Sequence, residues 1–236
     1  MDHKDGRHIK RVLDHYMARV PEVHVPCDRC LTTTRWGGRI VLMVVDAAFM
    51  SIGLNYFTAV VPKVALFRDR FVNTGRIIDC AALARAPLAP LRRLWKNRRS
   101  WDMARAAAGH LAQTGRASDR AALRAWARQA PLEGRHDDPI GRISGVGINT
   151  YQYLRMMGGV DTVMPDKIVK RVIFNIQREA GLTPGPADDL GFITMLETTS
   201  RACGYRPIDV CWMTWLVQSE GDKVRSEKYR DLLPNI

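Results

Sequence analysis

The sequence of 236 residues has no uncharged run long enough to cross a membrane as a helix. The longest such run extends from Ala47 to Pro62 and includes Gly53 and Asn55, whereas a spanning helix needs about 20 apolar residues. We interpret this run as buried core. The first residues, MDHKDGRHIK, have no apolar segment behind their charges, which argues against a secretory signal and favours a cytoplasmic location.

Acidic residues are in short supply. The chain has 24 Asp and Glu against 36 Lys and Arg, which gives a formal net charge of +12. An excess of this size favours a polyanionic partner, with nucleic acid as the first candidate and an anionic membrane surface as the second. The five cysteines are an odd number, as fits a reducing compartment where disulfides are rare.

No segment shows the strict alternation of apolar and polar residues that is typical of a half-buried strand, and no internal repeat is present. Apolar residues recur instead at helical spacing almost throughout, and the 46% of hydrophobic residues can bury the core of one or two lobes. The sequence therefore predicts an all-α fold. A loop is expected from Pro21 to Gly38, and helices are expected over 9–20, 39–52, 56–71, 100–113, 118–128, 188–203 and 207–219 and directly after Asp166.

A Gly-Val-Gly turn stands between two apolar stretches in residues 143–158. Glycine adopts backbone angles that are closed to other residues, so this turn can direct backbone N–H groups outward at the start of the following helix. Such groups bind phosphate well. The residues predicted to contact a DNA backbone here are Gly145, Val146, Gly147, Asn149 and Thr150.

One acidic residue, Asp166, follows the turn by about twenty residues and precedes an amphipathic helix. An isolated aspartate at a helix start is ordinarily only a stabilising charge, with a contribution of ~0.3–1 kcal/mol. The glycine turn upstream favours a catalytic carboxylate instead. The neighbouring cations Lys167, Lys170 and Arg171 are predicted to contact phosphate.

Residues 143–173, with their glycine turn and following aspartate, resemble the helix-hairpin-helix (HhH-GPD) DNA glycosylase superfamily. The resemblance implies an all-α, two-lobed fold with an active-site cleft between the lobes. Residues 1–236 would form a single glycosylase unit, with lobe one over about 35–134, lobe two over about 1–34 plus 135–236, and the helix-hairpin-helix near 138–158. It further implies that Asp166 stabilises the positive charge that develops on the sugar as an N-glycosidic bond breaks.

Members of the superfamily that also cut the DNA strand carry a lysine just before the hairpin threonine, where its amine forms a Schiff base. That position is Asn149 here, so the resemblance implies a monofunctional enzyme that leaves an abasic site. Lys167 and Lys170 lie beside Asp166 and offer a weak alternative amine, although phosphate contact is the favoured interpretation. The chain departs from the family at Ile168, where histidine is common.

The cysteines do not favour a cofactor. The family's iron-sulfur loop needs four closely spaced cysteines near the C-terminus, and only Cys203 and Cys211 stand there. Cys27 and Cys30 form half of a zinc site that His24 could extend, but two reduced thiols in a loop are the favoured interpretation. We expect no metal and no cofactor, apart from a monovalent cation that the hairpin could hold.

Two further regions match the family by order along the chain. The run from Arg39 to Val61 takes the place of the middle lobe's first helix and turn, from which members insert side chains into the duplex. Aromatic residues near the C-terminus often border the base pocket, and Trp215 lies on the same helical side as the candidates there. The candidates for wedge or pocket are Met50, Ser51, Gly53, Leu54, Asn55, Tyr56, Asp209 and Trp212.

The basic run KNRRSWDMAR leaves two interpretations open. It either tracks the DNA backbone or forms a solvated turn whose tryptophans face the core. Its residues are Lys96, Arg98, Arg99 and Arg105, with Trp95 and Trp101 among them.

The expected function is that of a DNA glycosylase that extrudes a damaged or modified base from double-stranded DNA and hydrolyses its N-glycosidic bond. We expect a monomer with no membrane partner. Base-excision repair and defence against modified phage DNA would use the same motifs, and the identity of the base is not encoded in them. The alternative is a noncatalytic helix-hairpin-helix protein that binds DNA.

Overall fold

The computed structural model describes residues 3–236 and is predominantly helical, which confirms the all-α prediction. The chain divides into two compact units. Unit 1 contains the residues up to Asp28 together with Asp161–Pro234, and unit 2 contains Arg29–Val160 with the last two residues. Within the described residues, no helix combines the length and apolar character needed to span a bilayer.

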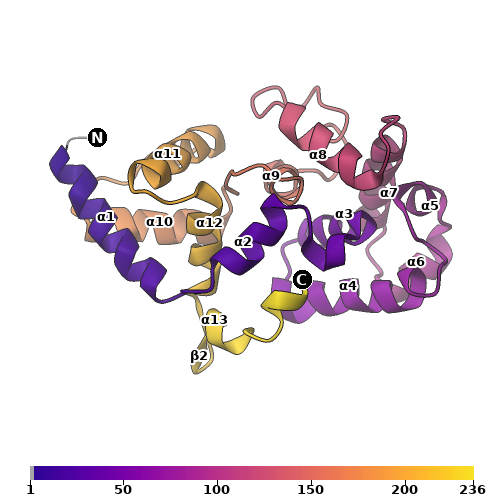
Figure 1. The fold of residues 1–236 in the computed structure, drawn as a ribbon, viewed down its shortest axis with the longest axis horizontal. Helices are drawn as coiled ribbons and strands as arrows, with labels where there is room; N and C mark the ends of the chain where they lie inside the picture. The colour runs from indigo at the N-terminus through magenta and orange to yellow at the C-terminus, as the bar shows by residue number, and fades with distance from the viewer. Residues whose placement is uncertain (1–2) are drawn as a thin grey trace. The chain divides into compact units, whose positions relative to one another are not determined.

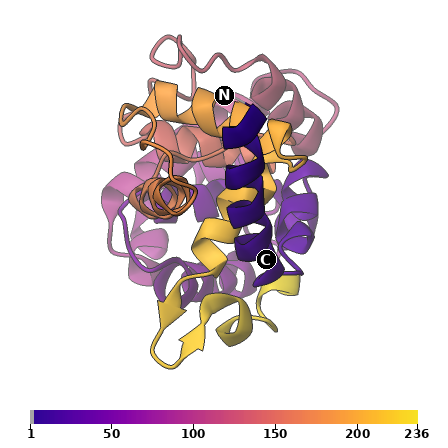
Figure 2. The same ribbon diagram turned by 90° about the vertical axis from the view of Figure 1, so that its left-hand side faces the viewer.

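Unit 1 is built around four helices: α1 (His3–Ala18), α10 (Lys167–Glu179), α11 (Asp189–Ala202) and α12 (Pro207–Leu216). The amphipathic α1, drawn in indigo in Figure 2, packs against α10 and α12. Its Ile9 and Leu13 side chains are buried. The Tyr16 hydroxyl donates to Glu179 Oε1 at 2.7 Å and ties α1 to the end of α10. After α12 come the short strands β1 (Ser219–Glu220) and β2 (Lys223–Val224), visible in yellow in Figure 2, and then α13 (Arg225–Lys228) and η4 (Leu233–Asn235).

Unit 2 has α3 (Ile40–Met50) at its centre, and every α3 residue from Ile40 to Phe49 is buried. Helix α3 packs against α7 (Arg98–Ala112) and α9 (Ile148–Met157), and α7 also packs against α5, as Figure 1 shows. The other elements of unit 2 are η1 (Arg35–Gly38), η2 (Tyr56–Val60), α4 (Val61–Phe67), η3 (Arg68–Val72), α5 (Cys80–Arg85), α6 (Leu88–Leu94) and α8 (Asp119–Gln129).

Three expectations about the fold differ from the structure. The predicted loop from Pro21 to Gly38 contains a helix, α2 (His24–Leu31). Pro26 does not prevent this helix, because it stands in the first turn, where a missing backbone N–H costs nothing. The β1–β2 hairpin was not predicted, since strands of two residues are too short for an alternation signal. The expected lobe limits also differ from these units, since residues 29–34 and 135–160, expected in lobe two, belong to unit 2, where α9 packs on α3 and α8.

Candidate functional site

Asp166 is the N-cap residue of α10, and both of its carboxylate oxygens are held. Its Oδ1 accepts hydrogen bonds from the backbone amides of Ile168 at 2.7 Å and Val169 at 2.9 Å. Its Oδ2 accepts one from the indole Nε1 of Trp215, on α12, at 2.8 Å. An aspartate before an amphipathic helix caps its free amides, and the helix–helix packing of α10 and α12 brings the indole to the other oxygen.

The surroundings of the Asp166 carboxylate affect its pKa in two opposite directions. Partial burial raises its pKa above that of an ordinary aspartate, while the two amide bonds, the Trp215 indole and the charge of Arg171 lower it in part. The carboxylate therefore has less water than a surface aspartate, and fixed donors replace part of its hydration. A carboxylate held in this way stabilises positive charge more strongly than one in bulk water.

Two arginines lie near Asp166 and Trp215. The Arg225 guanidinium lies over the Trp215 ring, 5.6 Å from its centroid. On α10, the Arg171 guanidinium donates to Gln218 Oε1 at 2.6 Å. These positive groups make the surroundings of Asp166 suited to an anionic ligand such as a nucleotide.

The aromatic partner of Asp166 is Trp215, whereas the tryptophan predicted to border a base pocket is Trp212. Trp212 is only 6% exposed and packs in the interior. The two tryptophans are three positions apart on one helix and lie on the same side of it, so helical spacing could not separate them. Only the packing of α10 against α12 makes Trp215 the contacting residue.

The two lysines beside Asp166 differ. Lys170 Nζ donates to Asp189 Oδ1 at 2.7 Å and to the Ala187 carbonyl at 2.6 Å. The Lys170 ammonium is therefore already bound within unit 1, and its contact with phosphate stays a prediction. Lys167 is exposed, as a phosphate contact requires.

The glycine turn lies in unit 2. Gly145 has φ +101°, a backbone conformation that side chains disfavour. Gly147 has φ −82° and is the N-cap residue of α9, and no side chain of the described residues caps this helix. The first amides of α9 consequently have no side-chain cap, and their contact with phosphate stays a prediction.

The segment before the turn is less regular than a helix-hairpin-helix motif implies. Asp138 Oδ1 accepts the amides of Ile140 and Gly141 at 2.9 Å each and starts one hydrogen-bonded turn, but no helix follows. Gly141 was not singled out from the sequence, yet a Cβ there would lie 1.8 Å from the Arg135 carbonyl oxygen. The expected first helix of the hairpin is therefore a single turn that depends on this glycine.

The other residues predicted to contact DNA at the hairpin differ in the exposure of their side chains. Thr150 is 3% exposed, so its side chain is buried and its predicted contact with DNA would have to be made by its backbone amide. The side chains of Val146 and Asn149 are half-buried. What remains of the predicted clamp is chiefly the backbone of residues 145–149.

The turn after α3 contains the predicted wedge candidates. Leu54 is 46% exposed and is one of two large apolar side chains in the described chain with such exposure. Met50 and Ser51 are half-buried, and the Asn55 side chain accepts the Thr58 amide at 3.1 Å. Gly53 turns the chain here with φ +73°. Leu54 is therefore the most exposed apolar side chain among the predicted wedge candidates.

Tyr56 is wrong as a wedge, since it is 6% exposed and belongs to a buried polar network. Asp46 Oδ2 accepts hydrogen bonds from the Tyr56 hydroxyl at 2.9 Å, the Tyr153 hydroxyl at 3.0 Å and the Trp36 indole at 2.8 Å. Arg35 Nη2 lies 3.5 Å from the same oxygen, and both charged side chains are fully buried. Burial raises the pKa of Asp46, and the Arg35 charge opposes that effect.

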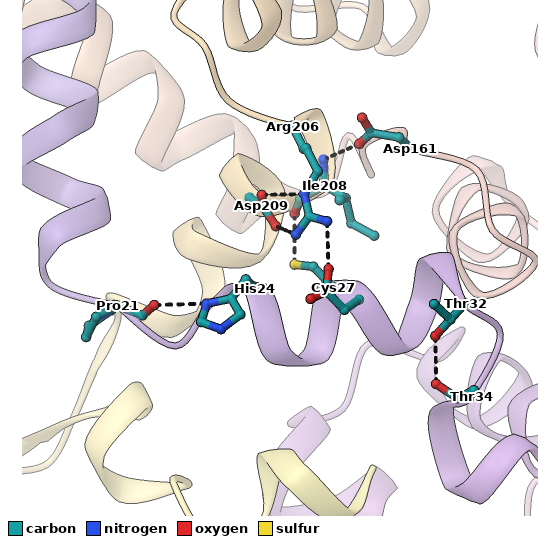
Figure 3. A network of polar contacts seen from close by, with 10 residues as sticks. Pro21, His24, Cys27, Thr32, Thr34, Asp161, Arg206, Ile208 and Asp209 are labelled. Atoms are coloured by element: carbon teal, nitrogen blue, oxygen red, sulfur yellow. Dashed lines mark hydrogen bonds and ion pairs between the residues drawn. The ribbon is translucent and has the colours of Figure 1, made fainter.

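Asp209, which was predicted to line a base pocket, forms an ion pair with Arg206 within unit 1. Figure 3 shows its carboxylate facing Arg206, which donates from Nε to Oδ2 at 2.7 Å and from Nη2 to Oδ1 at 2.8 Å. The same guanidinium reaches Asp28 Oδ1 at 2.6 Å. Both oxygens of this buried carboxylate already accept from Arg206, so the structure gives no support to the base-pocket assignment of Asp209.

Cys27 and Cys30 lie on helix α2, not in a loop, and both thiols are buried. In Figure 3 the Cys27 thiol faces the Ile208 carbonyl, 3.6 Å away, and His24 Nδ1 lies 3.1 Å from the Pro21 carbonyl. Across the part of the chain that the structure describes, no three His, Cys, Asp or Glu side chains gather as metal ligands would. His24 is thus not positioned as a third ligand beside the cysteines.

Comparisons with models of protein families, with curated proteins and with solved structures find no match to this chain. Its function must therefore be inferred from the side chains and backbone groups described above.

Proposed function

We propose that this protein is a monofunctional DNA glycosylase that hydrolyses the N-glycosidic bond of a damaged or modified base. The observation that supports this best is the Asp166 carboxylate, partly buried and held by two amides and one indole. Neither its burial nor its bond to Trp215 is needed for helix capping alone. A fixed, poorly hydrated anion is what the breaking of a glycosidic bond requires.

In the proposed mechanism Asp166 acts on the sugar. As the bond to the base lengthens, positive charge grows on the anomeric carbon and ring oxygen, and the carboxylate stabilises it. Because α10 amides occupy Oδ1, Oδ2 is the oxygen that faces the sugar or accepts a proton from the attacking water. Trp215 acts as a positioning residue that fixes the direction of Oδ2.

The hairpin in unit 2 supplies DNA binding in this proposal. The amides at the start of α9 hold one phosphate, and the exposed Leu54 fills the gap left by the extruded base. These contacts carry no base preference by themselves. The choice between repair and phage defence therefore depends on the base that is accepted, and we propose no particular one.

The residue at the family's Schiff-base position and the bound state of Lys170 support a monofunctional reaction. Asn149 occupies the position of the family's Schiff-base lysine, and the Lys170 ammonium is bound to Asp189 and Ala187. Only Lys167 remains beside Asp166 as an exposed amine. The proposed product is an unbroken strand with an abasic site.

The proposal is tested by incubating the protein with duplexes that contain normal, oxidised, alkylated, deaminated or phage-modified bases. We expect free base from at least one duplex and strand breaks that appear only after alkali. Borohydride should trap no covalent adduct. DNA binding without base release from any of these duplexes would instead support a noncatalytic binding protein.

Replacement of Trp215 by phenylalanine should move the pH dependence of base release. The charged form of Asp166 is the active one, so activity is lost as pH falls through its raised pKa. The Trp215 hydrogen bond lowers that pKa, and its loss should raise the pKa further and shift the acid limb to higher pH. Measured pH profiles of single-turnover base release check this. A Trp215→Phe profile that is merely lower at every pH would assign the indole a structural role only.

The two hairpin glycines should respond differently to valine. A Cβ at Gly147 meets nothing within 4 Å at an ordinary φ of −82°, so the stability of Gly147→Val should stay within about 0.5 kcal/mol of wild type. Its side chain should still obstruct phosphate at the α9 amides and weaken binding to all duplexes alike.

Gly145→Val, at φ +101°, should lower the free energy of unfolding by about 1 kcal/mol or more. Thermal unfolding and DNA titration separate the two effects, and full affinity in Gly147→Val would contradict phosphate binding at this turn.

A further inference from the structure

Around the connection from α6 to α7, the tryptophans are buried and the basic residues are exposed. Trp95 and Trp101 are buried; Trp95 stacks on Phe49 with ring centroids 4.3 Å apart, and the Trp101 indole donates to the Trp95 carbonyl at 2.9 Å. The basic residues between and before them are all exposed. They are Arg92, Arg93, Lys96, Arg98 and Arg99.

Among the described residues, four of these five cations have no hydrogen-bond or ion-pair partner. Arg98 pairs with Asp102 at 3.2 Å, whereas the side chains of Arg92, Arg93, Lys96 and Arg99 make no hydrogen bond or ion pair with any described residue. The position of Arg99 is also electrostatically unfavourable, because it lies in the first turn of α7, where the helix dipole is positive. An anion bound here would relieve both the mutual repulsion and the unfavourable dipole interaction.

Arg99 lies against the glycine turn. A Cβ built on Gly145 would stand 3.0 Å from Arg99 Nε and 3.5 Å from its Cγ. The guanidinium therefore packs over the position where any other residue would place a side chain. This contact joins the basic connection to the hairpin within unit 2.

We propose that Arg99 is a phosphate-binding residue of the hairpin and that Arg92, Arg93 and Lys96 extend the contact along the DNA backbone. This inference rests on the DNA partner of the proposed function. A guanidinium binds phosphate oxygens through two parallel N–H groups, while the α9 amides offer single donors. The combined site recognises the backbone of duplex DNA and not its bases. Gly145 is needed here both for its positive φ and to leave space for the Arg99 side chain.

Arg99→Gln and Arg98→Gln form a matched pair, since they remove the same charge from adjacent residues. Binding of each protein to an unmodified duplex is measured by fluorescence anisotropy between 50 and 200 mM salt. We expect Arg99→Gln to weaken binding on the order of tenfold at low salt and to reduce the slope of log affinity against log salt by about 0.9. Arg98→Gln should change both quantities clearly less, because its charge is already paired with Asp102.

Equal effects of the two substitutions would show that only net charge matters and would overturn the assignment of Arg99. Unchanged binding in Arg99→Gln, with an unchanged melting temperature, would overturn it as well. Preferential binding of wild type to phosphatidylserine vesicles over duplex DNA would assign the surface to a membrane and reject the DNA proposal. Because the assay uses unmodified DNA, its result is independent of base release, whose absence would reject glycosylase activity alone.

Discussion

Asp166→Asn is expected to lower the rate of base release by about 1000-fold or more and to leave DNA affinity nearly unchanged. Asparagine is as good an N-cap residue as aspartate, so its side-chain oxygen keeps the bonds from the Ile168 and Val169 amides. The negative charge that stabilises the sugar is lost, and an electrostatic contribution of this kind is worth about 4 kcal/mol, which corresponds to a rate change of about 1000-fold. Single-turnover release of base from the best duplex measures the effect.

The matched control is Asp188→Asn. Asp188 also caps a helix of unit 1, where its Oδ1 accepts the Gly191 amide at 2.8 Å, and it has no place in the proposed chemistry. Its substitution should leave base release at the wild-type rate. Excision that persists in Asp166→Asn, or that falls equally in both variants, would remove Asp166 from the catalytic role.

Asp46→Ala is expected to lower the free energy of unfolding of unit 2 by about 3–5 kcal/mol. The substitution removes the acceptor of three buried hydrogen bonds and the buried carboxylate that faces Arg35. The backbone of Trp36 has φ +53°, a conformation that costs about 1–3 kcal/mol. The hydrogen bond from its indole to Asp46 helps to hold this conformation, and the substitution removes that bond. A domain is stable by only about 5–15 kcal/mol, so the loss is a large fraction of the total.

Urea unfolding followed by tryptophan fluorescence measures this change, and Asp69→Ala is its control. Asp69 pairs with Arg68 at 2.9 Å on the surface of the same unit, with both side chains exposed. Loss of such a pair should cost no more than about 1 kcal/mol. Equal destabilisation by the two substitutions would show that the Asp46 network contributes no more than an ordinary surface pair.

The network has a consequence for the hairpin. Tyr153 belongs to α9, which begins at the hairpin, and Tyr56 directly follows the turn that carries Leu54. Both hydroxyls donate to the same carboxylate oxygen of Asp46. The two segments proposed to contact DNA are thereby joined through one buried residue, so their spacing does not depend on surface loops.

The sequence by itself determined the helical class, most helix positions and the start of α10. These features depend on local physics: apolar spacing at 3.6 residues, a prolyl stop after α1 and an aspartate that caps the amides just after it. The same local physics identified Gly145 as a residue with a special backbone and Leu54 as part of a turn. It could not identify α2, whose proline in the first turn looks like a loop signal when packing is unknown.

Tertiary structure decided which side chains remain available for function. Spacing made Trp212 and Trp215 equivalent. Only the packing of α12 against α10 brought Trp215 to Asp166, while Trp212 is buried. In the same way, contacts between segments distant in sequence bound Lys170 to α11 and Tyr56 to Asp46, and placed Arg99 on Gly145. A residue's chemistry is a local property, but its burial and its partners depend on elements far along the chain, which a periodic pattern does not encode.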